Sequence, residues 1–212
     1  MKGLFLKDYY MASKYCRLHF VIMVIFAVIS MGYGNLFLLV YPAVLVGMVP
    51  VSLIAYDEKS KWNIYAGVFP YTKKELVSVK YILMLVFLGV EILLLTGTQT
   101  VMMLLQGNFE LRYLIKIIAM VPFLGLISPC VMLPSVYKYG VEKGRVLYYV
   151  MIMVISGIIG AVGVIGEDKD IMGMFIEQNM WAAVVMLLAA AVMLAVSWNL
   201  SVKFYEKTEI VA

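Results

Sequence analysis

Six long apolar stretches alternate along this chain with polar segments, and basic residues are concentrated in every second polar segment. Each stretch approaches the ~20 residues that an α-helix needs to cross a hydrocarbon core of ~30 Å. Loops that stay in the cytoplasm retain Lys and Arg, so this alternation indicates the orientation of the chain. The pattern predicts an all-α integral membrane protein with both termini on the cytoplasmic side.

The apolar stretches predict six transmembrane helices, with boundaries that are soft by several residues. The predicted spans are Leu18–Met31, Leu36–Tyr56, Lys80–Leu105, Tyr113–Val136, Val146–Ile165 and Trp181–Leu200. Of the 17 basic residues, only Arg112, Lys116 and Lys169 fall in the outer segments. No small-residue cleavage site follows the first stretch, so we interpret it as a retained span and not as a signal peptide.

Composition indicates the same class: 64% of the 212 residues are hydrophobic and only 14% are charged, whereas soluble domains have about 25% charged residues. Six crossings use the whole chain, so we expect one transmembrane domain over 1–212. A catalytic or nucleotide-binding body would then belong to another polypeptide. We attribute the net charge of +4 to basic loops and contact with anionic lipid, and we expect no nucleic-acid partner.

Residues 1–17 form a leader with helical periodicity. Lys7 and Lys14 lie on the face opposite to an apolar one, as in helices that lie flat in a membrane interface. The apolar face consists of Phe5, Tyr9, Ala12 and Cys16. The leader is thus either a simple anchoring helix or a contact surface for a cytosolic partner.

The longest inner loop, 56–80, mixes charged residues with large aromatic ones. Thr72 and Glu75 have the spacing of a capping box, in which each side chain accepts from the other residue's backbone amide. Pro70 disfavours helix at the preceding residue, so we expect a break there and a new helix that runs into the third span. The alternative is an ordinary interfacial loop whose aromatic side chains anchor at the headgroups.

Glu91 lies inside the third apolar stretch, where an ionised group costs about 2–4 kcal/mol. It should face the protein interior, and Thr98 lies near the same helical face. Together they form a candidate polar stripe along a substrate path. The alternative is a protonated Glu91 that is hydrogen-bonded to a neighbouring helix.

Small residues on the fifth span, namely Gly157, Gly160 and Ala161, permit close approach of two helices. The seam is either between two chains or within one. The outer segment 166–180 has an acidic start and an apolar stretch, and we expect an external loop that dips into the membrane.

Enzymatic motifs are absent from the sequence. There is no P-loop for ATP phosphates, no paired-histidine zinc motif beside the single His19, and no G-x-S-x-G elbow. Two isolated cysteines give neither a metal spacing nor a disulfide framework. We therefore expect no catalytic residues, no metal site and no cofactor on this chain.

Three segments of the amino-terminal third resemble a known family. They are MKGLFLKD at 1–8, YDEKSKW at 56–62 and FPYTKKELV at 69–77. They are similar to the small six-span permeases of bacterial type-2 ABC exporters. The most similar group is linked to export of, or immunity to, antimicrobial and cytolytic peptides such as bacitracin, lantibiotics and phenol-soluble modulins.

The resemblance implies two permease chains, expected to be identical, above two cytosolic ATPase subunits that bind ATP and Mg²⁺. It also implies a coupling helix in the first inner loop, here within Asp57–Glu75, in a protein of the bacterial cell membrane. The expected contact residues are Asp57, Glu58, Lys61, Trp62, Pro70, Thr72, Lys73 and Glu75.

The functional hypothesis is a permease subunit that exports amphipathic or antimicrobial peptides with energy from a separate ATPase. The alternative from another class is a membrane immunity protein or sensor that binds peptides and transports nothing. A secondary transporter is less favoured, since Glu91 is the single mid-span acid and no inverted repeat is visible.

Overall fold

The computed structural model describes the chain except residues 1, 31–35, 67, 151–152, 154–179 and 208–212. The described part consists of helices and connections, without strands. The helices are α1 (Lys2–Tyr15), α2 (Arg17–Ile29), α3 (Leu36–Gly47), α4 (Val49–Lys59), α5 (Trp62–Ala66), α6 (Lys73–Gln106), α7 (Leu111–Tyr139) and α10 (Met180–Lys207). Residues 141–150 are also helical. The predicted all-α membrane class is confirmed.

Four described helical segments are long and apolar enough to cross a membrane: Val40–Lys59, Lys73–Gln106, Leu111–Tyr139 and Trp181–Lys207. A fifth crossing is possible if α1 and α2, which meet at a bend of 70°, count as one broken span. Most of the predicted fifth span, Val146–Ile165, lies outside the described residues. The number of six spans therefore stays a prediction.

The predicted second span consists of two helices, because α3 ends at Gly47 and α4 begins at Val49. Pro50 lies in the first turn of α4, where its missing N–H removes no helical hydrogen bond. The third span is one helix of 34 residues, about 51 Å long at ~1.5 Å per residue. Since a crossing needs only ~20 residues, the first turns of α6, with their charged residues, extend beyond the hydrocarbon.

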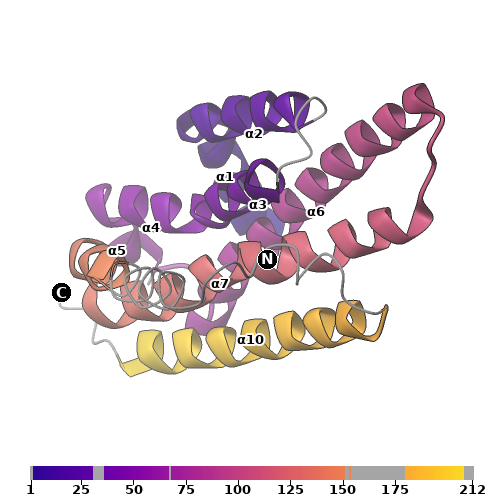
Figure 1. The fold of residues 1–212 in the computed structure, drawn as a ribbon. Helices are drawn as coiled ribbons and strands as arrows, with labels where there is room; N and C mark the ends of the chain where they lie inside the picture. Colours follow the sequence, from indigo (N-terminus) through magenta and orange to yellow (C-terminus); the bar gives the residue numbers. More distant parts are fainter. Residues whose placement is uncertain (1, 31–35, 67, 151–152, 154–179, 208–212) are drawn as a thin grey trace.

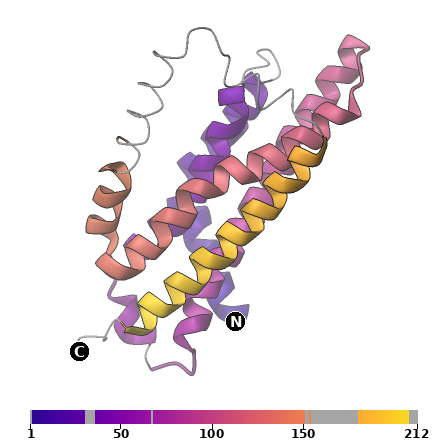
Figure 2. The same cartoon turned by 60° about the horizontal axis from the view of Figure 1, so that its bottom comes forward.

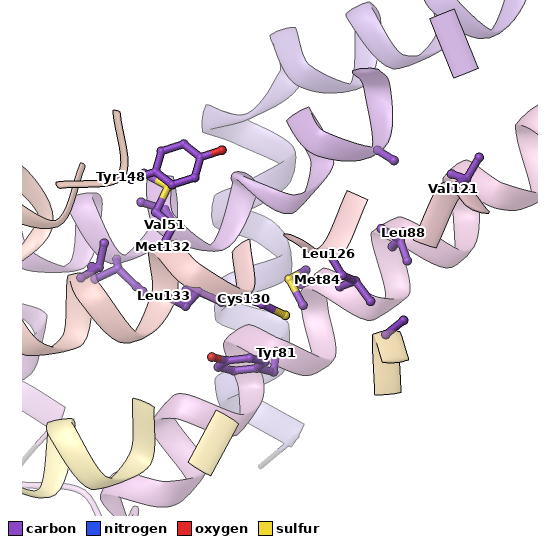
Figure 3. Close-up of a cluster of buried hydrophobic side chains, with 14 of the residues drawn as sticks. Val51, Tyr81, Met84, Leu88, Val121, Leu126, Cys130, Met132, Leu133 and Tyr148 are labelled. Atoms are coloured by element: carbon purple, nitrogen blue, oxygen red, sulfur yellow. The ribbon is translucent and has the colours of Figure 1, made fainter. Parts of the chain in front are cut away.

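The helix α7 lies between its neighbours and packs against α3 on one side and α10 on another (Figures 1 and 2). The main apolar cluster joins α6 and α7, and Figure 3 shows Tyr81, Met84 and Leu88 of α6 near Leu126 and Cys130 of α7. Pro122, Pro129 and Pro134 all lie inside α7, which stays helical from Leu111 to Tyr139.

Small residues bring α3 and α7 into close contact. A Cβ atom added at Gly125 would lie 2.8 Å from the Cβ of Ala43, and one added at Gly47 would lie 2.9 Å from the Cγ of Pro129. Real Cβ atoms do not approach so closely, so glycine is required on both helices. This packing corresponds to the small-residue contacts by which membrane helices associate.

Candidate functional site

The start of α6 is fixed by the predicted capping box. The Glu75 amide donates to the Thr72 hydroxyl at 3.2 Å, and the Thr72 amide donates to the Glu75 carboxylate at 2.9 Å. This second hydrogen bond, from the backbone of Thr72, holds the pKa of the Glu75 carboxyl below its usual value. The sequence prediction of a new helix after Pro70 is confirmed, since α6 begins at Lys73.

Between α4 and α6 the chain makes a short connection with an apolar tip. Lys61, at the turn after α4, has a φ of 54°, in the left-handed region that a non-glycine residue rarely adopts. Ile64, Tyr65 and Phe69 are exposed, and Val68 is 85% exposed. The ring of Trp62 stacks on that of Phe69 in the tip, at a centroid distance of 6.1 Å.

Four charged side chains meet at the base of this connection, and we call them the charge ring. Lys80 of α6 lies 2.9 Å from Asp8 of α1 and 2.6 Å from Asp57 of α4. Lys7 of α1 lies 2.5 Å from Asp57 and 3.3 Å from Asp8. Each lysine thus contacts both aspartates, and the charges alternate around a closed ring.

The charge ring is largely removed from solvent. The side chains of Asp8, Lys80 and Asp57 are 1%, 7% and 8% exposed, and Lys7 is 24% exposed. The ring borders a cavity of 290 Å³ that is also lined by Trp62, Tyr137 and Tyr205. The Nζ of Lys7 lies 4.2 Å from the centroid of the Trp62 ring, a cation–π contact that joins the charge ring to α5.

Two further predicted contact residues attach the connection to other helices. Glu58 accepts a hydrogen bond of 3.2 Å from the amide of Val141, at the start of the helix over 141–150, where a negative charge is favourable. Lys73 donates to the backbone carbonyl of Glu206 in α10 at 3.0 Å. Of the predicted contact residues, Asp57 and Trp62 thus lie at the charge ring, Glu58 and Lys73 contact other helices, and Thr72 and Glu75 cap α6. Lys61 and Pro70 are exposed.

The predicted substrate-path residues lie elsewhere, on α6. Glu91 is 0% exposed, and within the described part of the chain neither carboxylate oxygen has a hydrogen-bond partner. The Thr98 hydroxyl donates to the carbonyl of Leu95 in its own helix at 2.9 Å. The nearby Gln99 is buried and donates at 3.2 Å to the carbonyl of Ser30 in the neighbouring α2 segment.

The predicted interface residues Gly157, Gly160 and Ala161 lie outside the described residues, as does most of the external segment 166–180. The prediction about them stays untested.

Lys7, Asp8 and Lys80 were not predicted as site residues from the sequence. One signal was available, because Leu4, Asp8 and Ala12 follow one another at intervals of four and form the buried stripe of α1. An acid on that stripe needs a basic partner. The identity of the partner was not readable, since it depends on how three separate helices pack.

Comparison with known proteins shows the family. A family model described as ABC-2 family transporter protein matches residues 3–206. No curated protein and no solved structure matches the chain. The family match covers nearly all of the sequence and agrees with the apolar helices described above. In this family the membrane subunit works with an ATPase on a separate polypeptide. The chain therefore belongs to the ABC-2 transporter family, as a permease-type subunit of the cell membrane.

Proposed function

We propose that this chain exports amphipathic or antimicrobial peptides, and that its segment Asp57–Glu75 receives the ATPase. One observation supports the docking of the ATPase at this segment: the apolar tip is exposed on a polar, charged connection. The tip consists of Ile64, Tyr65, Val68 and Phe69. Exposed apolar side chains of this kind mark contact sites for other proteins or for membranes.

The connection that carries this tip is attached to several helices. The capping box fixes the first turn of α6, and α6 continues without a break to Gln106. Glu58 and Lys73 attach the two sides of the connection to the helix over 141–150 and to α10. A displacement of the tip would therefore move several membrane helices together.

The proposed assembly contains two copies of this chain and two ATPase subunits that hold ATP and Mg²⁺. The six predicted spans are half of the twelve that such exporters use, which supports two permease chains. We propose that the two chains are identical, with Gly157, Gly160 and Ala161 near their interface. The basic residues support a cytoplasmic position for both termini and for the tip. With Cys16 and Cys130 replaced by serine, a membrane-impermeant thiol reagent should label Asn108→Cys in intact cells and spare Ser60→Cys. The reverse pattern would overturn this orientation.

A peptide substrate is supported by the resemblance of the leader and the first loop to peptide exporters. The buried Glu91 adds a second argument. Its carboxylate has no hydrogen-bond partner in the described chain, and acids that are buried in a membrane at such a cost in free energy usually have a function. We propose that Glu91 and Thr98 line the path of the peptide.

Glu91→Gln keeps shape and hydrogen-bonding capacity but cannot ionise, so it should change export while folding is retained. Unchanged export across pH would assign Glu91 a structural role.

The test of the function is copurification with an ATPase, followed by substrate-stimulated ATP hydrolysis and peptide export in reconstituted vesicles. Trp62→Ala, and the double change Lys73→Ala with Glu75→Ala, should keep the chain in the membrane and reduce export. Val68→Asp should weaken ATPase binding, because Val68 is 85% exposed and packs on little within the chain.

The matched control is Phe109→Asp, an exposed apolar residue in the turn at the other end of α6. It should leave ATPase binding unchanged. If the wild-type chain binds and responds to peptides without any ATPase, the alternative of a non-transporting immunity protein or sensor is correct.

A further inference from the structure

We propose that the charge ring of Lys7, Asp8, Asp57 and Lys80 is the joint that transmits movement of the coupling segment to α1 and α6. Lys7, Asp8 and Lys80 are then positioning residues for transport, although none of them lies in the coupling segment. This inference rests on the proposed docking of an ATPase at Asp57–Glu75.

The connectivity of the ring carries the argument. Its members come from three helices, since Lys7 and Asp8 lie on α1, Asp57 on α4 and Lys80 on α6. Asp57 is also the first residue of the coupling segment, and it contacts both lysines. Any displacement of the end of α4 therefore acts at once on α1 and on α6.

The contact between Lys7 and Trp62 adds the short helix α5 to the same joint. Trp62 in turn stacks on Phe69 near the exposed tip. A continuous series of contacts thus runs from the tip through Trp62 and Lys7 to Asp57, Asp8 and Lys80.

The net stabilisation that a buried ion cluster provides is not enough to explain why this ring is charged. Burying four charges is costly, and well-packed apolar side chains often stabilise a fold as well as or better than a buried ion pair does. Charged contacts instead impose specific partners and geometry. The ring is electrically neutral as a unit, so it can lie at the edge of the membrane without a further counter-ion.

The surroundings leave room for rearrangement. The four residues line one side of the 290 Å³ cavity, and Lys7 remains partly exposed to solvent. The ring is therefore not packed on every side, and the lysine side chains have space to move when α4 and α1 shift.

The experiment compares variants of the complete permease–ATPase complex in vesicles, with ATPase binding, ATP hydrolysis and peptide export measured separately. Lys80→Met breaks the ring but leaves two acids facing one lysine, so it is paired with a neutral version, Asp8→Asn and Lys80→Met together. This version removes α6 from the ring, leaves Asp57 paired with Lys7 and changes no residue of the coupling segment. The neutral version buries no unbalanced charge. Lys80→Arg keeps the charge, and Lys203→Met removes an exposed lysine from α10 near the same end of the helices.

We expect the neutral version to assemble with the ATPase and hydrolyse ATP, while export per ATP falls at least tenfold and peptide no longer stimulates hydrolysis. Lys80→Arg should recover most of the coupling, and Lys203→Met should behave as wild type. If the neutral version assembles and exports at the wild-type ratio, or if it fails to assemble while Lys80→Met assembles and stays coupled, the inference is wrong. An inactive wild-type complex would instead contradict the proposed function.

Discussion

Two regions of the molecule, the charge ring and the contact between α3 and α7, are held together in different ways. At the base of the α4–α6 connection, oppositely charged side chains from α1, α4 and α6 contact one another within 2.5–3.3 Å. Deeper in the bundle, α3 and α7 touch through Ala43, Gly47, Gly125 and Pro129, with no room for another methyl group. The first region has specific partners beside a cavity, whereas the second is close-packed. The charged region is suited to movement and the packed region to rigidity.

The largest expected effect lies in the charged region. Asp57→Ala removes a carboxylate that contacts both lysines and leaves two cations facing Asp8 alone. Breaking a buried ion pair on one side costs about 3–5 kcal/mol, so the thermal midpoint of the purified protein in detergent should fall steeply. A midpoint equal to that of the wild type would show that the charge ring does not hold these helices together.

The next effect tests the packed region. Gly125→Ala places a methyl group 2.8 Å from the Cβ of Ala43, and overpacking of this kind costs about 1–3 kcal/mol. The matched control is Gly89→Ala, because a Cβ at Gly89 meets nothing within 4 Å. Since alanine is a better helix former by about 1 kcal/mol, the control should be neutral or stabilising. The same loss at both positions in a thermal-shift assay would contradict the close contact of α3 and α7.

The smallest effect on stability concerns the cap of α6. Thr72→Ala removes the acceptor of the Glu75 amide and should cost about 1 kcal/mol. Thr72→Ser keeps the hydroxyl and should restore the wild-type value. Export per ATP hydrolysed should fall more than stability, because the cap fixes the start of α6 relative to the connection. If Thr72→Ala exports at the wild-type ratio, a fixed start of α6 is not required for transport.

Local features of the site were predictable from the sequence, and non-local ones were not. The capping box depends on two residues three positions apart, and it was predicted from Thr72 and Glu75 alone. The burial of Glu91 was predicted because an acid in a transmembrane stretch is costly in contact with lipid and therefore faces the protein interior. In contrast, Lys7 and Asp57 are 50 positions apart, and no pattern along the chain identifies them as partners.

In the fold, too, local features were predictable from the sequence and contacts between distant segments were not. The extent of α6 and α7 was close to prediction, because long apolar runs define long helices. The division of the second span between α3 and α4 was not predicted, although Pro50 was a readable signal for a helix start. A small-residue seam was predicted on the fifth span, but the one between Gly47 and Gly125 was not predicted. Small residues show where close approach is possible but not which helices meet.

The central claim is that the ATPase binds at the tip of the α4–α6 connection. A photo-reactive amino acid at position 68, compared with one at position 109, tests it most directly, because Val68 and Phe109 are both exposed apolar residues at opposite ends of α6. After illumination of the assembled complex, we expect a cross-link to the ATPase from position 68 and none from position 109. Cross-linking from position 109, or from neither position in a complex that hydrolyses ATP in response to peptide, would contradict the account.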